Sequence, residues 1–366
     1  MNRRYFLTAA GLVPVACAFP ELAAAAEPRT FAPAVGPWRS FEITTRVDII
    51  GGGTDTQAWV PVPNVNSDWQ VSQDSAWSGN AASVRAYADR ASDAAMIHAK
   101  WADSEAAPRL EVVSRIRTRD RRVDWQAADR KDASRGDLSE SLRPTKLIPT
   151  DGIVLATARE ATRGKSGDVA KVRALYDWVV ENTYREPTVR GCGVGDIRFM
   201  LETNNLGGKC ADLNALFVGL CRSVGIPARD LYGIRVAKSK FPYKELGAGT
   251  ADISKAQHCR SDVWLQQYGW VAVDPADVAK VMRQETAEWI KSAKHEVVAP
   301  VYSGLFGAWE GNWMAYNTAH DVKLPDSNGP ALPFLMYPQA EVKRSPVDSL
   351  DPDTFRYSIT AREIST

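Results

Sequence analysis

Residues 207–212 read Gly-Gly-Lys-Cys-Ala-Asp, and the pattern that follows them decides how the centre of the chain folds. Apolar residues then recur every three or four positions, as in a helix with one buried face: Leu213, Leu216, Phe217, Leu220 and Val224. Gly225 ends this pattern, and Pro227 prevents its continuation. The two glycines allow a tight turn just before it. We therefore expect a buried helix that begins at Cys210.

The predicted helix start gives Cys210 a chemical advantage over the other cysteines. Unpaired N–H groups and the positive end of the helix dipole lower the pKa of a thiol there, which favours the nucleophilic thiolate. The backbone N–H of Cys210 also points to where an oxyanion would form. Cys221 falls in the apolar half of the same helix and is expected to be an inert core thiol, whereas Cys192 and Cys259 do not start a helix.

A histidine and an aspartate follow in a pattern typical of a β-hairpin. One alternating run begins at His258, a second runs from Trp270 to Asp274, and residues 267–269 form the expected turn. A hairpin of this length places His258 and Asp274 at about the same level, with β-carbons roughly 5 Å apart. A carboxylate beside an imidazole fixes its tautomer while the other ring nitrogen takes a thiol proton. Cys210, His258 and Asp274 therefore form a candidate catalytic triad.

These motifs together resemble the transglutaminase-like superfamily. Residues 208–229 are similar to its nucleophile helix, and residues 258–275 resemble its histidine and aspartate strands. The resemblance covers about residues 146 to 282, and its three motifs occur in the family's order. It implies a papain-like α+β core without a cofactor, in which Cys210 is the nucleophile. The same resemblance implies that His258 is the general base and acid and that Asp274 orients it.

Other candidate site residues are less clearly defined by the sequence. Many members of the superfamily carry an aromatic residue two positions after the histidine, where this chain has Arg260. Its guanidinium could favour an acidic substrate or pair with Asp262. The second oxyanion donor is open, with Asn204 and Asn205 as candidates, and Trp270 is a candidate for substrate contact.

The sequence is compatible with two alternatives to a cysteine enzyme. A zinc site would use Cys210, Cys259 and His258, but zinc ligands usually come in close pairs such as Cys-x₂₋₄-Cys. Here only His258 and Cys259 are close, and adjacent strand residues point to opposite faces, so we expect no metal. A non-catalytic binding module could also keep this fold, although a scaffold has no need of an intact cysteine, histidine and aspartate.

The remaining sequence indicates how the chain is divided. Residues 38–126 contain short alternating runs separated by Gly, Asn and Pro, which predicts a β-sandwich-like domain. Residues 127–145 are polar and predict a linker. Helical patterns followed by antiparallel strands over residues 146–300 predict an α+β catalytic domain, and residues 301–366 a C-terminal extension that is partly β.

The first 26 residues have the order of a secretory signal peptide. Arg3 and Arg4 precede an apolar stretch at residues 9–19, and small alanines follow at 23–26. The stretch is too short to span a bilayer, and its Arg-Arg-x-Phe-Leu core resembles a twin-arginine signal. We expect a mature protein without a membrane span, in the periplasm or cell envelope, with peptide or protein substrates such as peptidoglycan stems.

The overall composition does not favour a nucleic acid or a membrane surface as partner. The 366 residues are 45% hydrophobic and 24% charged, with a net charge of +1, which is ordinary for a globular protein. This balance gives no electrostatic reason to expect a nucleic acid or a membrane surface as partner. Four cysteines beyond the signal peptide are too few to predict a disulfide framework.

Overall fold

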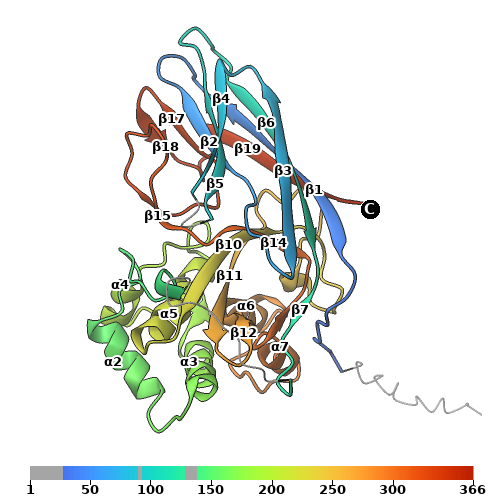
Figure 1. Cartoon of the computed structure of the whole chain (residues 1–366), viewed down its shortest axis with the longest axis vertical. Coiled ribbons are helices and arrows are strands. Elements are labelled where there is room, and N and C mark those ends of the chain that lie inside the picture. The colour runs from blue at the N-terminus through green and yellow to red at the C-terminus, as the bar shows by residue number, and fades with distance from the viewer. Residues whose placement is uncertain (1–27, 90–92, 128–137, 366) are drawn as a thin grey trace, which may run out of the picture.

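The computed structural model describes residues 28–89, 93–127 and 138–365. The predicted signal peptide and part of the predicted linker lie outside the described residues. Two β-sheets form one end of the molecule, and a four-stranded sheet with helices forms the other (Figure 1). The expected α+β class with an N-terminal sandwich-like domain is confirmed.

The first sheet of the sandwich has the strand order β19-β1-β6-β3. Its strands are β19 (Phe355–Ile364), β1 (Arg39–Ile49), β6 (Arg109–Thr118) and β3 (Gln70–Gly79). Along β1 and β6 buried and more exposed residues alternate, as predicted for strands with one buried face. The last strand of the chain therefore pairs with the first.

The second sheet has the order β18-β17-β2-β5-β4. Its strands are β18 (Ser345–Val347), β17 (Gln339–Val342), β2 (Gln57–Pro61), β5 (Ala95–Lys100) and β4 (Ser83–Ala88). Apolar side chains of both sheets share one core, among them Val47, Leu110, Val60 and Ile97. Residues after 338 thus supply strands to both sheets of the sandwich.

The α+β part is built around one buried helix. Helix α5 (Cys210–Ser223) is buried from Cys210 to Arg222 and packs against a sheet of order β12-β11-β10-β14. These strands are β12 (Gly269–Val273), β11 (Gln257–Leu265), β10 (Ala228–Arg235) and β14 (Trp313–Asn317). The helices around α5 are α2 (Gly152–Ala161), α3 (Asp168–Asn182), α4 (Ile197–Glu202) and α6 (Pro275–Gln284).

Short elements complete this part and join it to the sandwich. The described residues also contain α7 (Ala299–Gly304), a 3₁₀ turn η1 (Lys244–Leu246), and three two-stranded pairs. The pairs are β7 (Arg121–Arg122) with β13 (Ala308–Trp309), β15 (His320–Val322) with β16 (Leu332–Phe334), and parallel β8 (Tyr184–Arg185) with β9 (Gly207–Gly208). Within the described residues, no helix has the length and apolarity needed to cross a membrane.

Candidate active site

The chain before Cys210 is held so that this cysteine is the first residue of α5, as the sequence predicts. Gly207 and Gly208 form β9 against β8, and both positions are too crowded for a side chain. A Cβ on Gly207 would lie 2.5 Å from the Tyr184 ring. The N–H groups of the first helical turn have no acceptor within the helix, so they and the helix dipole surround the thiol with positive potential.

The carboxylate of Asp212 ties the loop that carries Cys192 to the start of α5. It accepts hydrogen bonds from the N–H groups of Val194 and Gly195, both at 2.9 Å. Its second oxygen accepts from the N–H of Lys209, also at 2.9 Å. The second N–H of the helix donates to the carbonyl of Cys192 at 2.9 Å. The Cys192 loop is thereby fixed against the N-terminus of the helix.

The expected position of Asp274 within the hairpin is wrong in one respect. In the β11–β12 pairing Ser261 lies opposite Val273, so His258 and Asp274 are not cross-strand neighbours. Strand β12 ends at Val273, and Asp274 instead caps α6, where it accepts from the N–H of Asp277 at 3.0 Å. The Asp-Pro sequence explains this, because proline favours the first position of a helix and aspartate the cap.

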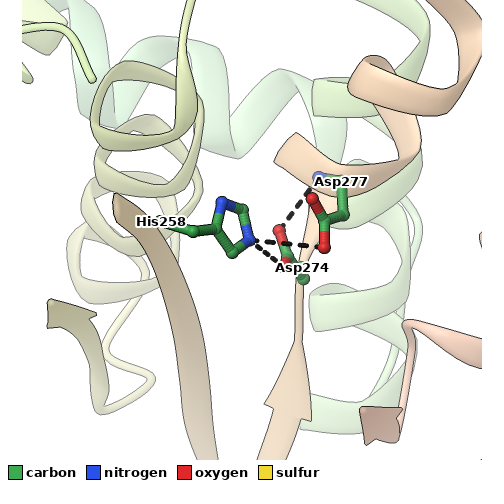
Figure 2. Close-up of side chains that lie close together, drawn as sticks. All are labelled: His258, Asp274 and Asp277. Carbon is green, nitrogen blue, oxygen red and sulfur yellow. Dashed lines mark hydrogen bonds and ion pairs between the residues drawn. The ribbon is translucent and has the colours of Figure 1, made fainter. Parts of the chain in front are cut away.

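The side chain of Asp274 nevertheless reaches the imidazole. Nε2 of His258 lies 2.8 Å from Oδ2 of Asp274, and both side chains are buried. Figure 2 shows one ring nitrogen directed toward the carboxylates and the other directed away. Since a carboxylate only accepts, Nε2 carries the proton of this hydrogen bond, and Nδ1 remains for a further partner.

A second carboxylate, which the sequence analysis missed, lies beside the same ring nitrogen. Oδ2 of Asp277 is 3.3 Å from Nε2 of His258, and its other oxygen accepts from Arg235 at 2.5 Å (Figure 2). A helix-capping aspartate followed three residues later by another acid is a recognisable pattern, with both acids at the start of one helix. That spacing in Asp274-Pro-Ala-Asp277 could have identified it.

The two carboxylates set the protonation of the imidazole. Burial and the Arg235 guanidinium lower the pKa of His258, but Asp277 and Asp274 outweigh them and raise it to about 9. The imidazolium form therefore persists through neutral pH. Such a cation beside a thiol stabilises the thiolate.

The thiol of Cys210 has the opposite shift. Hydrogen bonds with the thiols of Cys192 and Cys259, and then with His258, hold its pKa well below the ordinary value although burial opposes this. All four described cysteines are free. Burial raises the pKa of Cys221, as expected of a core thiol. A role for Cys192 and Cys259 as neighbours of Cys210 was not expected from the sequence, because they come from a separate loop and strand.

Cys210 and His258 line one cavity of about 820 Å³. This volume is typical of pockets that hold a small molecule or a short peptide segment. Cys192, Lys209 and Gln257 also line it. The thiol and the imidazole are therefore both accessible from a space large enough for a substrate.

Arg260, a candidate for substrate contact, does not line this cavity. Its Nε lies 3.6 Å from Oδ2 of Asp274, and Nη1 donates to the carbonyl of Glu310 at 3.0 Å. The guanidinium is buried beside Trp309 and Trp313. It faces the carboxylate behind the imidazole rather than the substrate space.

The remaining candidates from the sequence also lie outside the cavity lining. Asp262 is buried and accepts from Arg121 at 3.1 Å and from Arg229 at 2.8 Å, so it does not pair with Arg260. Trp270 covers the Arg229 guanidinium at 3.9 Å. Asn204 and Asn205 are exposed in the turn after α4.

Two further buried side chains hold the histidine and aspartate in place. Asn214 Nδ2 donates to the carbonyl of Cys259 at 2.8 Å and lies 3.4 Å from Oδ1 of Asp274. Trp313 Nε1 donates to the carbonyl of His258 at 2.9 Å. Asn214 is a polar residue four positions after Cys210, within an otherwise apolar helix face. This position could have indicated from the sequence that Asn214 belongs to the site.

His258, Asp274 and Asp277 are close enough together to suggest metal ligands. The positive charge that two buried carboxylates require is already supplied by two guanidiniums, Arg235 on Asp277 and Arg260 near Asp274. A divalent ion at this point would face both cations directly, which costs free energy in a buried site. The arrangement fits a hydrogen-bonded charge cluster better than a metal centre.

Comparisons with known proteins agree with the fold and the site's position. The sequence profile of the Transglutaminase-like superfamily matches residues 155–275. An uncharacterized protein of Haemophilus influenzae is 34% identical over 342 residues, which are 88% of this chain and 91% of the other. A proposed cysteine protease from Cytophaga hutchinsonii has a similar fold, with a TM-score of 0.56 at 13% identity over 91% of this chain and 93% of that chain.

A second solved structure is more distant. The periplasmic domain of TgpA from Pseudomonas aeruginosa, bound to ethylmercury, has a TM-score of 0.36 at 16% identity and covers 72% of this chain and 78% of that chain. The profile match contains both the helix that begins at Cys210 and the hairpin that leads to Asp274. On this profile, residues 155–275 of the chain belong to the transglutaminase-like superfamily.

Proposed function

We propose that this protein is a cysteine-dependent enzyme that hydrolyses amide bonds of peptide or protein substrates or transfers their acyl groups to amines. The observation that carries the proposal is the position of one imidazole. His258 lines the same cavity as Cys210, while its Nε2 lies 2.8 Å from Asp274 on the other side. Cys210 is the nucleophile, His258 the general base and acid, and Asp274 the group that orients the ring.

The proposed reaction has two stages. The Cys210 thiolate attacks the carbonyl carbon of a substrate amide, and the backbone N–H of Cys210 stabilises the oxyanion. The C–N bond breaks as His258 gives its proton to the leaving amine, which leaves a thioester on Cys210. Water or an amine then gives a proton to His258 and attacks the thioester, which releases an acid or a new amide and restores the thiolate and imidazolium.

Thiol labelling tests the proposed nucleophile without a known substrate. At pH 6.5, iodoacetamide should alkylate Cys210 before Cys192, Cys221 and Cys259, because among these four described cysteines only Cys210 has a pKa held well below the ordinary value. Peptide mass spectrometry identifies the labelled residue, and Cys221 in the same helix is the internal control. His258→Ala should slow the labelling of Cys210 and leave that of Cys221 unchanged. Equal rates at both cysteines would contradict an activated thiol.

A non-catalytic binding module with the same fold is the alternative. An acyl-enzyme decides between them: incubation with cell-envelope extract should add a mass to Cys210 of the wild type that is absent from Cys210→Ser. Fragmentation of the adduct identifies the acyl group. Addition of amine donors then separates the two reactions, because transfer consumes the amine and hydrolysis does not.

We also propose that the protein is exported through the twin-arginine signal of residues 1–26. The paired arginines are required by that route, so Arg3→Lys with Arg4→Lys should retain the protein inside the cell. Fractionation of cells that express the two forms measures this. An equal periplasmic amount of both forms would refute it.

A further inference from the structure

The cavity of Cys210 and His258 carries more positive charge than the composition of the chain explains. The chain has a net charge of +1. Seven Lys and Arg residues nevertheless line the cavity, and Asp252 is the one carboxylate among the described residues that line it. The fold therefore gathers cations at this place.

Three of these cations are neutralised by carboxylates that do not line the cavity. The pairs are Arg190 with Asp348 at 2.6 Å, Arg235 with Asp277 at 2.5 Å, and Lys280 with Glu245 at 3.1 Å. Such pairs hold their cations in place and cancel much of their charge. They form the cavity wall and are not the groups that we expect to attract a ligand.

The other four cations have no carboxylate within ion-pair distance in the part of the chain that the structure describes. They are Arg185, Lys209, Lys255 and Arg356. Arg185 and Arg356 donate instead to neutral acceptors, the side chain of Gln284 at 3.1 Å and the carbonyl of Pro352 at 3.0 Å. Burial and the nearby Arg185 lower the pKa of Lys209, as expected when cations repel one another.

These four cations come from both parts of the molecule. Lys209 directly precedes the nucleophile, and Lys255 lies three residues before His258. Arg356 belongs to β19 of the sandwich, which is bonded to the same loop by Ile253 N–H to the carbonyl of Ile359 at 2.8 Å. The cavity is therefore lined by residues of both the sandwich and the α+β part.

We propose that the acyl donor is an acidic peptide, which carries carboxylates close to the amide that Cys210 attacks. This substrate class rests on the proposed function, because amide chemistry at Cys210 is what makes the substrate a peptide. Carboxylates are the anions of a peptide, and they can pair with the four cations that have no carboxylate partner. A cationic peptide is repelled by the same groups, which provides discrimination. Arg260 does not contribute to this charge, since it lies outside the cavity lining.

The first test needs no peptide. Iodoacetate and iodoacetamide alkylate thiols by the same displacement of iodide, but only iodoacetate is an anion. We expect the ratio of their rates at Cys210 to exceed that of free N-acetylcysteine by about tenfold at low salt, and to fall as salt screens the cavity. Lys255→Gln with Arg356→Gln should lower this ratio at least threefold. The matched control is Lys165→Gln, an exposed lysine outside the cavity lining, which should not change it.

The second test uses paired peptides that differ only in Glu against Gln beside the scissile amide. We expect kcat/KM to be at least about tenfold higher for the Glu peptide, and this preference to shrink in Lys255→Gln/Arg356→Gln. A further measurement compares how well glutarate, a carboxylate, and inorganic phosphate slow the alkylation of Cys210 by iodoacetamide. Stronger protection by glutarate supports carboxylate recognition, and stronger protection by phosphate overturns it.

The outcomes separate this proposal from the proposed function. Suppose that Cys210 is alkylated rapidly, that its ratio of iodoacetate to iodoacetamide rates equals that of a free thiol, and that both peptides are turned over equally. These results would overturn the acidic substrate and leave the proposed cysteine enzyme intact. If Cys210 reacts with iodoacetamide no faster than Cys221, the proposed nucleophile is wrong, and the substrate class falls with it.

Discussion

Replacement of Asp277 by asparagine should lower the pKa of His258 with little change in shape. Asparagine keeps an oxygen that can accept from Arg235, so the hydrogen bond at this position survives while the negative charge is lost. The Arg235 guanidinium, which lowers the pKa of His258, is then no longer neutralised. Both changes act in the same direction.

The distance between the charges gives the size of the effect. With Nε2 of His258 at 3.3 Å from Oδ2 of Asp277, an effective dielectric constant near 20 gives an attraction of about 5 kcal/mol. At about 1.4 kcal/mol per pKa unit this is an upper bound of roughly three to four units, and relaxation of the site reduces it. We expect a fall of about two units from the value near 9.

The assay is an NMR titration of the histidine rings. The chain has four histidines, so His258→Gln assigns the His258 signal by its loss. Above the pKa of His258 the imidazolium can no longer protonate the leaving amine, so the alkaline limit of activity should move with this pKa, from near 9 toward neutral pH. Asp252→Asn is the matched control, since it removes a carboxylate that lines the same cavity and makes no ion pair with His258.

One result would refute this reasoning. If His258 titrates at the same pH in Asp277→Asn and in the wild type, and thermal unfolding shows both proteins folded, the carboxylate of Asp277 does not set the protonation of the imidazole. A wild-type value near the ordinary 6.5 would also remove the basis for an imidazolium at neutral pH.

Substitutions of Asp274, Asp212 and Arg121 test other parts of the site and its surroundings. Asp274→Asn should lower kcat by about a hundred- to ten-thousand-fold, because the imidazole of His258 loses the acceptor that orients it. Asp274→Ala should in addition lower the free energy of unfolding in urea by about 1 kcal/mol, because the cap of α6 is lost. Asp212→Ala should lower the free energy of unfolding by roughly 2–4 kcal/mol and slow the alkylation of Cys210, since three backbone N–H groups lose their acceptor. Asp196 caps α4 through one N–H, so the control Asp196→Ala should lower it by about 1 kcal/mol and leave that alkylation unchanged. Arg121→Met should lower the free energy of unfolding by about 3 kcal/mol, because buried Asp262 then keeps only Arg229 as its partner. The alkylation rate of Cys210 should not change. An unchanged stability would show that the ion pair between Arg121 and Asp262 adds nothing to it.

Local sequence determined the elements that carry the candidate triad. The helix that begins at Cys210 was predictable because its glycines, its apolar spacing and its terminating Gly225 all act within a few residues of one another. His258 and Asp274 were identified in the same way, from two alternating runs and a turn. The order of these motifs was enough to indicate the family.

Only the tertiary structure decided what surrounds these residues. Strand β19 pairs with β1 although more than 300 residues separate Phe355 from Ile49, and Arg356 thereby reaches the cavity of Cys210. No local pattern predicts such a pairing, because it depends on which sheet edge remains open after the rest of the chain has folded.

The charges at the site are likewise decided by the tertiary structure. The pKa of His258 depends on Asp277 and Arg235, and that of Cys210 on Cys192 and Cys259. A charge acts through distance in space and through burial, and neither can be read from spacing along the chain. The sequence therefore determined the candidate triad, and the fold determined which groups surround it and which of them carry charge.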